Sequence, residues 1–443
     1  YSDYNIPLDA VVDRSARGDL VRQKWVTKHQ YGWNPRLDWT HPNGKASFGG
    51  AFYYFESEHW GQVVWAEKVT SALDPRHKYY EYFGEKYFAS VFAHEYYHLN
   101  DKLALMGDLQ LKYLKYKFDQ TRMGPFEGYK YNLDWLFLSP RIGLNYALKP
   151  ETNAYTSFSV SSREPNDDNI YDADDPGKVP QIQPLHRVSS GDPTVENERV
   201  YDLELGLSHR ETSYRLGLNF FWMQFNNENL FEGGFDSLGR EITINIDRAV
   251  HAGFELTGSV KPVNRLTVDG NFALNFNRIS EYDTTLSYTV DSISIDPVTQ
   301  ETVVVESTES AVIDYDGKTP PLFPAYLGNL NVDYQHHWYR VTWRARMVGR
   351  QYVELFNDEE LSIDPYFTSS VTASFIWQDF LETGRLTLSL HVDNLFDNEY
   401  EVSGYGGNWA SRDQGEPVRV NSWAEYFVGP ERSFYGQLRL ELF

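Results

Sequence analysis

The feature that most constrains this chain is polarity that alternates from residue to residue over about fifteen segments of roughly ten residues or more. Within 214–222, Tyr, Leu, Leu, Phe and Trp occupy every second position, and within 386–393 Leu and Val alternate with Thr, Ser, His and Asp. Because successive side chains of a strand point to opposite faces, this period predicts an all-β protein. A soluble sandwich is compatible with the same alternation.

The length of the connections between strands separates a soluble sandwich from a membrane-spanning β-barrel. The short connections predicted between segments are 41–45, 99–102, 149–153, 209–212, 261–264, 335–338 and 379–384. The long ones are 60–85, 118–132, 163–197, 226–247, 281–323, 351–365 and 394–431. The two kinds alternate, so all long connections fall on one side, as in outer-membrane barrels with short periplasmic turns and long external loops. We therefore predict an antiparallel transmembrane β-barrel with about fifteen strands in this chain, located in the bacterial outer membrane.

Composition removes several other classes. No run of about 18 apolar residues occurs, which excludes a helical membrane span. The chain has no cysteine, so disulfide scaffolds and thiolate metal sites are absent. An excess of 63 acidic over 40 basic residues argues against a nucleic-acid partner, because backbone phosphates require clustered Lys and Arg.

The strand count is odd, whereas bacterial barrels of one chain have even numbers and start and finish on the periplasmic side. The first predicted strand begins at about Asn34 and descends from the long-loop side. We therefore interpret residues 1–443 as the C-terminal part of an outer-membrane β-barrel domain, with upstream strands outside this chain.

One motif links the chain to a known family. Asn394, Leu395, Phe396 and Asp397, followed by Tyr400, resemble the Asn-Leu-Phe-Asp-x-x-Tyr signature of TonB-dependent outer-membrane receptors, particularly those of Bacteroidetes-like bacteria. Segments similar to others of this family are 28–35, 57–61, 162–165, 198–206, 248–255, 349–352 and 364–366. Each motif is short, but together, in this order, they are specific and cover nearly the whole chain.

The resemblance implies a barrel of about 22 strands, of which about seven are not in this sequence. It also implies an N-terminal plug domain with a TonB box, and residues 1–33 resemble neither. The implied partners are the TonB energy-transducing complex, acting through that plug, and the barrel-assembly machinery. Phe443 resembles the terminal aromatic assembly signal, although Leu438, Leu440 and Leu442 share a face that Phe443 does not.

Candidate lumen and plug contacts come from the segment 339–350. Arg340, Arg344, Arg346 and Arg350 share one parity, opposite Val341 and other apolar residues. An arginine on the lipid face at mid-bilayer costs about 2–4 kcal/mol, so the arginine parity is expected to face the lumen. There the guanidinium groups can pair with plug carboxylates or with an anionic solute; a plug-holding role is the preferred interpretation.

No motif indicates catalysis or a cofactor. Gly-x-Ser-x-Gly, His-Glu-x-x-His and Walker patterns are all missing, so we expect a non-enzyme. The pairs His94 with His98 and His336 with His337 lack further ligands at suitable spacing, so we predict no metal site. The stretch 281–323 holds nine acidic residues and one basic residue, which we interpret as a solvated loop that bridges to lipopolysaccharide through divalent ions.

The function predicted from these features is active import. The resemblance implies a transporter that binds a scarce small-molecule or oligomeric nutrient at its external loops and admits it through a plugged barrel. Two alternatives remain at this point: a passive outer-membrane channel, and a structural barrel that supports a surface assembly. The identity of the nutrient is not encoded in the fold.

Overall fold

The structure is a computed structural model. It describes residues 4–12, 18–74, 76–122, 127–175, 178–183, 188–189, 192–235, 241–295, 302–382, 384–413 and 416–442. The chain divides into two compact units, each of which is described by itself. Unit 1 comprises Tyr1–Asn100, Ala104–Gly143 and Ser159–Arg199, and unit 2 comprises Asp101–Leu103, Leu144–Phe158 and Val200–Phe443.

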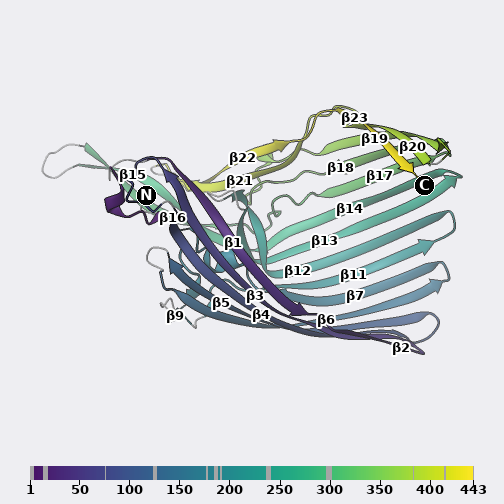
Figure 1. Cartoon of the computed structure of the whole chain (residues 1–443), viewed down its shortest axis with the longest axis horizontal. Coiled ribbons are helices and arrows are strands. Elements are labelled where there is room, and N and C mark those ends of the chain that lie inside the picture. Colours follow the sequence, from purple (N-terminus) through teal and green to yellow (C-terminus); the bar gives the residue numbers. More distant parts are fainter. Residues whose placement is uncertain are drawn as a thin grey trace. The chain divides into compact units, whose positions relative to one another are not determined.

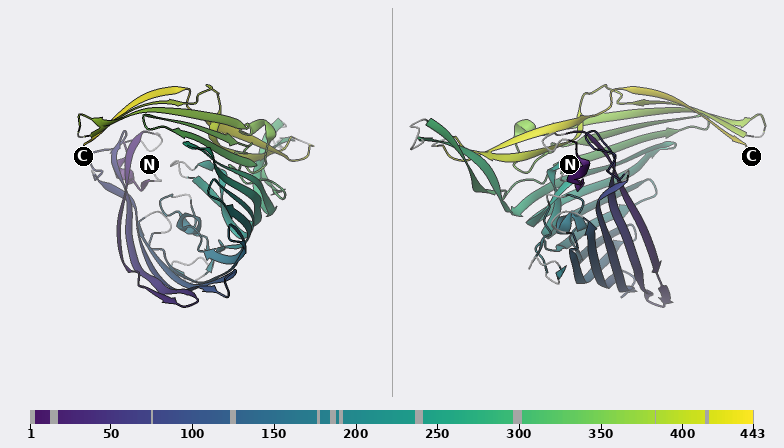
Figure 2. Two further views of the ribbon diagram at one scale, coloured as in Figure 1. Left: turned by 90° about the vertical axis from the view of Figure 1, so that its right-hand side faces the viewer. Right: turned by 60° about the vertical axis from the view of Figure 1, so that its left-hand side comes forward.

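Unit 2 is built on long antiparallel strands that pair in chain order. They are β12 (Tyr214–Phe235), β13 (Glu241–Val263), β14 (Leu266–Glu281), β17 (Tyr326–Gln335), β18 (Tyr339–Val348), β19 (Tyr366–Phe380), β20 (Gly384–Asp393) and β23 (Ser433–Leu442). Figures 1 and 2 show these strands running side by side. Two hairpins and a short 3-10 helix lie in the long connections: β15 (Asp283–Ile295) with β16 (Thr302–Asp314), β21 (Glu401–Ser411) with β22 (Arg419–Val428), and η4 (Glu359–Leu361).

Unit 1 contains η2 (Leu8–Ala10), β1 (Leu20–Trp33), β2 (Arg36–His41), β3 (Gly44–Ala66), β4 (His77–His98), α1 (Asp167–Tyr171), β8 (Ile182–Gln183), β9 (Val188–Ser189), β10 (Asp192–Pro193) and most of β5 (Leu103–Arg122). β6 (Lys130–Lys149), β7 (Thr152–Arg163) and β11 (Glu198–Arg210) contribute residues to both units. β1 and β2 pair with successive parts of β3, so they act as one strand interrupted at Asn34 and Pro35.

The predicted all-β architecture is confirmed. With β1 and β2 counted together, and the short β8, β9 and β10 and the two loop hairpins set aside, the described residues contain fifteen long strands. The connections 42–43, 99–102, 150–151, 211–213, 264–265 and 336–338 are all turn-sized, and β20 begins four residues after the end of β19. No helix among these residues has the length and hydropathy needed to cross a membrane.

Several strands are longer than the sequence predicted. β1 begins at Leu20 rather than near Asn34, and β3, β4, β12 and β13 run for 22 or 23 residues each. Crossing a bilayer takes about 9–11 residues, so these strands extend well beyond it. In the parts of these strands that extend beyond the bilayer, neither face has to be apolar. Backbone hydrogen bonds to the neighbouring strands are enough to continue the strand there. The alternation used for prediction therefore disappears before the strand ends.

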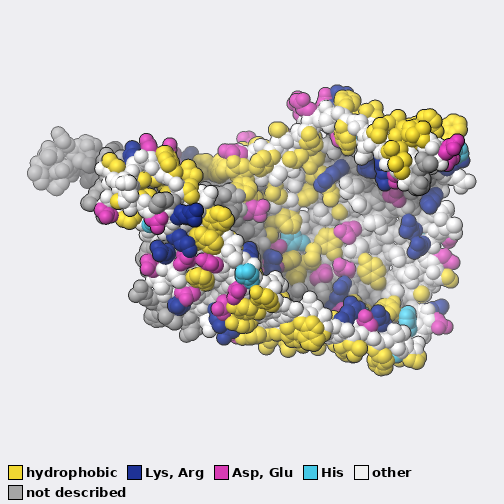
Figure 3. Space-filling view, viewed as in Figure 1, with side chains coloured by type: hydrophobic (Ala, Val, Ile, Leu, Met, Phe, Trp, Pro, Cys, Tyr) yellow, Lys and Arg dark blue, Asp and Glu magenta, His cyan; other side chains and the backbone are white. Residues whose placement is uncertain are grey.

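The two faces of the unit 2 sheet differ in chemistry. One row across five strands contains Leu256, Phe272, Gly328, Met347 and Phe367. Three large side chains of this row are exposed, with 51% for Leu256, 39% for Phe272 and 41% for Met347, and Phe367 is partly exposed. Figure 3 shows hydrophobic side chains gathered in the same way over β20 and β23. An exposed apolar face of this extent is what lipid contact requires.

Candidate functional site

The opposite face of the same sheet carries two polar rows. The row next to the apolar one contains Thr257, Asn271, Asn329, Arg346 and Thr368, and the following polar row contains Ser259, Asp269, Asn331, Arg344 and Ser370. Each row takes one residue from each of β13, β14, β17, β18 and β19. Strand pairing alone therefore brings together five side chains that are far apart in the sequence.

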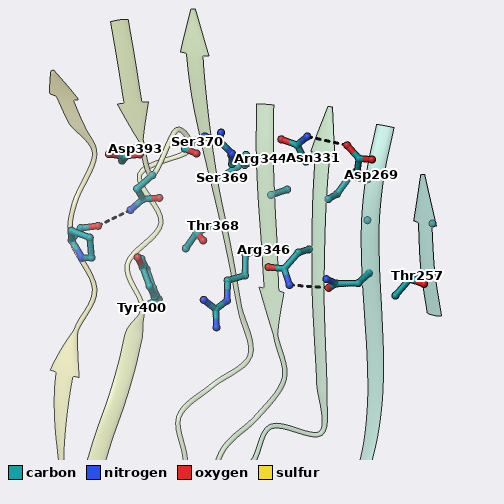
Figure 4. Close-up of a pocket in the computed structure, with 18 residues that line it drawn as sticks. Thr257, Asp269, Asn331, Arg344, Arg346, Thr368, Ser369, Ser370, Asp393 and Tyr400 are labelled. Atoms are coloured by element: carbon teal, nitrogen blue, oxygen red, sulfur yellow. Dashed lines mark hydrogen bonds between the residues drawn. The ribbon is translucent and has the colours of Figure 1, made fainter. Parts of the chain in front are cut away.

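These rows line a cavity of about 700 Å³. Figure 4 shows Arg346 extending toward Thr368 and Tyr400, while Arg344 lies beside Ser370. Asp393, the last residue of β20, and Asn394, which follows it, also line the cavity. The structure thus places two of the four predicted arginines next to Asn394 and Tyr400 of the family motif.

The floor of the cavity is ordered by amide side chains. Asn329 Nδ2 donates to Asn271 Oδ1 at 2.9 Å, and Asn331 Nδ2 donates to Asp269 Oδ2 at 3.4 Å. Within the described part of the chain, neither Arg344 nor Arg346 forms an ion pair or a side-chain hydrogen bond. The site therefore offers two guanidinium groups that are positioned by the strand and form no ion pair within the described part of the chain, although the carboxylates of Asp269 and Asp393 line the same cavity.

Arg340 has a different environment, near the short turn between β17 and β18. Its Nε donates to Asp333 Oδ1 at 2.6 Å, and Thr342 Oγ1 donates to the same oxygen at 2.6 Å. Thr342 is buried, and Asp333 is 9% exposed. Since its charge already has a partner, Arg340 stabilises the end of the hairpin rather than contributing a free cation.

Arg350 lies apart from the other three, because β18 ends at Val348. Its Nη1 is 3.4 Å from Glu359 Oε2, and it lines a second cavity with Arg278 and Tyr352. The shared parity in the sequence therefore groups Arg344 with Arg346 in one cavity, but it does not bring Arg350 to them.

The family motif forms a compact turn after β20. Asn394 has a positive φ of 45°, which asparagine tolerates better than most residues. Its Nδ2 donates to the carbonyls of Asn398 and Pro430, and its Oδ1 accepts from the Asn398 backbone N–H at 3.1 Å. The Leu395 N–H donates to the Ser369 carbonyl at 2.8 Å, which fastens the turn to β19.

Three further motif residues make contacts around this turn. Hydrogen bonds from the backbone and side chain of Arg432 hold the pKa of Asp397 below its usual range, with the Arg432 N–H at 2.9 Å. The Tyr400 ring stacks on Tyr366 with centroids 4.8 Å apart, and Phe396 remains 59% exposed beside Phe367. The structure therefore gives the motif an architectural explanation, with Tyr400 reaching the cavity.

The described part of the last strand, β23, agrees with the prediction that its leucines share one face. Leu438 pairs with Leu388 and Leu440 with Leu386, on the exposed apolar face. Phe443, the predicted assembly signal, lies outside the described residues.

The predicted histidine pairs are placed separately from the cavity. His94 Nδ1 is 2.9 Å from Asp108 Oδ2, and the rings of His336 and His337 are 3.9 Å apart. Among the residues that the structure describes, there is no group of three or more His, Asp or Glu arranged to hold a metal ion. The stretch 281–323 is partly a hairpin, β15 with β16, instead of an extended loop.

Sequence reasoning did not identify Asp269, Asn329 and Asn331 as part of the site. Their only signal is their parity in β14 and β17, which they share with many other polar residues. Which of these residues lies beside Arg344 depends on strand register, and register is not visible in the local sequence.

Comparison with known proteins agrees with this architecture. A protein-family model described as "TonB dependent receptor-like, beta-barrel" matches residues 1–395. A comparison with curated proteins found no match.

Solved structures share the fold at low sequence identity. The ferric yersiniabactin uptake receptor FyuA from Yersinia pestis is 16% identical, with a TM-score of 0.61 over 96% of this chain and 56% of that chain. The copper transporter OprC is 14% identical (TM-score 0.63, 95% and 57%), and the ferric citrate transporter FecA is 12% identical (0.60, 95% and 56%). The chain thus spans slightly more than half the length of these structures.

Proposed function

Because the chain belongs to the family of TonB-dependent receptor β-barrels, we propose that it is the barrel of an active transporter that imports a scarce nutrient. Barrels of this family lie in the outer membrane, and the receptors work with TonB. The proposed path is capture at the long loops, followed by passage through the barrel when TonB pulls on a plug. We assign transport and no catalysis to the chain, in keeping with a family of receptors and transporters.

The observation that supports this proposal is the cavity around Arg344 and Arg346. Two guanidinium groups that form no ion pair with any residue the structure describes lie on the polar face of β18. A guanidinium group binds carboxylates and phosphates through two parallel hydrogen bonds, so such a surface favours an anionic occupant.

We assign these two arginines first to retention of the plug. A plug inside a barrel has to be held by polar contacts that break and form again during each transport cycle. Exposed ion pairs are individually weak, at about 0–1 kcal/mol, so a few of them hold the plug without making its movement prohibitively slow. The amide groups of Asn329 and Asn331 add neutral donors and acceptors to the same surface.

The class of nutrient is a separate question. The titles of the similar structures name ferric yersiniabactin, copper and ferric citrate, so complexes of metals are the first class to test. Glycans are the second class, because the loops of such barrels diverge freely in sequence. A deletion strain should grow poorly under iron limitation if the first class is correct, and poorly on a limiting glycan if the second is.

The energy source tests the mechanism. We expect uptake to be lost when the TonB complex is deleted, while the amount of receptor in the outer membrane remains unchanged. Uptake that continues without TonB would indicate a passive channel. Unchanged growth of the receptor deletion strain on every nutrient would favour a scaffold role instead.

A further inference from the structure

The connection that follows β7 is fastened to unit 1 by a series of ion pairs. Three of its acidic residues each pair with a lysine on a different strand: Glu164 with Lys112 of β5 at 3.2 Å, Asp167 with Lys86 of β4 at 2.7 Å, and Asp174 with Lys24 of β1. The order of the acids along the chain follows the order of these strands across the sheet. We call residues 163–175 the strap.

Strand register places the three lysines on one face. Lys86 lies on β4, Lys112 pairs with Ser90 of β4, and Lys24 is level with Tyr80 of β4 in the row that crosses β3. Positions 80, 86 and 90 have the same parity. Val91 has the other parity, and its side chain is 50% exposed on the apolar face. The strap therefore lies on the polar face, which is the face that lines the lumen in a barrel.

Apolar packing anchors the middle of the strap. Ile170 and Tyr171, at the end of α1, are 0% and 5% exposed in a cluster that includes Tyr116 and Phe118. Tyr171 Oη also donates to Gln120 Oε1 at 2.7 Å. The ion pairs of Asp167 and Asp174 lie on either side of this anchor. Loss of the ion pairs can therefore free the two ends of the strap while its middle stays on the wall.

The ion pairs are suited to exchange. The side chains of Lys86 and Asp167 are 24% and 44% exposed, so water screens their attraction. Each of the three lysines also lies near an aromatic ring, with Nζ 5.8 Å from the ring centroid for Lys24 and Tyr80, 4.8 Å for Lys86 and Tyr116, and 4.8 Å for Lys112 and Phe137. The ring attracts the ammonium group. A lysine therefore keeps one favourable contact when its carboxylate leaves.

The spacing of the lysines favours an extended ligand. Along β4, four residues separate the rows of Lys86 and Lys112, and six separate the rows of Lys86 and Lys24. At the rise of a strand these offsets are about 13 Å and about 20 Å. A compact anion such as citrate is too short to engage all three lysines, whereas a chain with repeated carboxylates can do so, as the strap itself does.

We propose that the three lysines form a binding site for an extended solute with several carboxylate groups, and that the strap closes this site until such a solute arrives. The carboxylates of the solute take the places of Glu164, Asp167 and Asp174, and the ends of the strap are released. This inference rests on the proposed function, because it names the chemistry of the solute and the contact that it must displace. Binding to the purified protein tests it without TonB.

The first test measures hydrogen exchange of residues 163–175 in the full-length protein in detergent, with decaglutamate as the probe. Decaglutamate should speed exchange of the strap at least tenfold, while citrate or sodium chloride at the same ionic strength should not. Decagalacturonate is the second probe, and opening by only one of the two decamers identifies a peptide or a sugar backbone. Equal opening by sodium chloride, or no opening by either decamer, would overturn the proposal.

Variants separate a binding site from a structural contact. Removal of the strap charges (Glu164→Gln, Asp167→Asn and Asp174→Asn together) should tighten binding of the decamer that opens the strap at least fivefold. Removal of the lysines (Lys24→Gln, Lys86→Gln and Lys112→Gln together) should abolish it. The matched control is Glu85→Gln, which takes away the partner of Lys117, 3.2 Å distant on the opposite face of β4 and β5, and should not change binding. Unchanged affinity in the first variant, or binding retained in the second, would contradict the proposal.

Folding and transport are controlled separately. Heat-modifiable migration in gels reports whether each variant has formed a barrel. If the triple acid variant does not assemble, Asp167→Asn alone should still bind the decamer severalfold more tightly, and unchanged affinity in this assembled variant would refute the strap. Uptake that continues without the TonB complex would refute active transport and leave the strap assignment intact, whereas lack of decamer binding refutes only the strap assignment.

Discussion

The carboxylate of Glu354 accepts a hydrogen bond from the side-chain amide of Asn408, with Oε2 and Nδ2 2.7 Å apart. Glu354 is 1% exposed and also accepts from the backbone N–H groups of Phe356 and Asp358. Asn408 lies on β21, whereas Glu354 belongs to the connection between β18 and β19. One buried carboxylate therefore joins two of the long loops on the side where we expect the nutrient to arrive.

The first prediction concerns this junction. Glu354→Ala leaves two backbone N–H groups without their acceptor and removes one of the two acceptors of the Asn408 amide, which also donates to Ser422 Oγ. Each buried unsatisfied group costs about 1–3 kcal/mol. We expect the β21 and β22 hairpin to become sensitive to protease on intact cells, while the barrel still assembles. Glu360→Ala, at an exposed position of the same loop, is the matched control and should have no effect. If the hairpin resists protease equally well in Glu354→Ala and in Glu360→Ala, the junction is unimportant.

The second prediction is a pH dependence at the family motif. Arg432 lowers the pKa of Asp397, so the ionised carboxylate stabilises the turn. A lowered pKa in the folded state means that this contribution is complete above the ordinary carboxyl pKa and is lost as pH falls through the lowered value. We expect faster hydrogen exchange at the Arg432 N–H below about pH 4. Asp397→Asn should remove this pH dependence, and an unchanged profile in that variant would contradict the assignment.

The third prediction is topological. Because the short turns mark the periplasmic side, epitopes inserted at 42–44, 150–152 or 261–264 should be hidden from antibody on intact cells. Epitopes at 163–197, 281–323 or 400–428 should be accessible. Permeabilised cells provide the control, since all positions should then react. Labelling of the first group alone on intact cells would invert the orientation.

The sequence was sufficient for some of these features and not for others. Alternating residue polarity predicted the two faces of β18. An apolar environment on one side of a strand and a polar environment on the other select apolar and polar residues at alternate positions of the local sequence. The alternation missed β1, whose side chains are exposed on both faces over most of its length. The pairing of Arg344 with Asn331 was not predictable either, since strand register depends on the packing of whole strands.

The fourth prediction tests which face of β18 contacts lipid. Val341 and Arg344 lie on opposite faces: Val341 pairs with Tyr334 and Ala373, and Arg344 pairs with Asn331 and Ser370. Val341→Arg places a guanidinium group in the exposed apolar face, where an arginine costs about 2–4 kcal/mol at mid-bilayer and less toward the membrane boundary, so we expect a reduced yield of assembled barrel.

Arg344→Ala removes a side chain that has no ion-pair partner among the described residues, so folding should lose less than about 0.5 kcal/mol. If Arg344 holds the plug, the same variant should alter uptake or make the plug more accessible to protease, although the receptor is present in normal amounts. Heat-modifiable migration measures assembly, and uptake per assembled receptor measures function, so the two effects are separable. Equal assembly of Val341→Arg and Arg344→Ala would show that the faces of this strand are assigned the wrong way round.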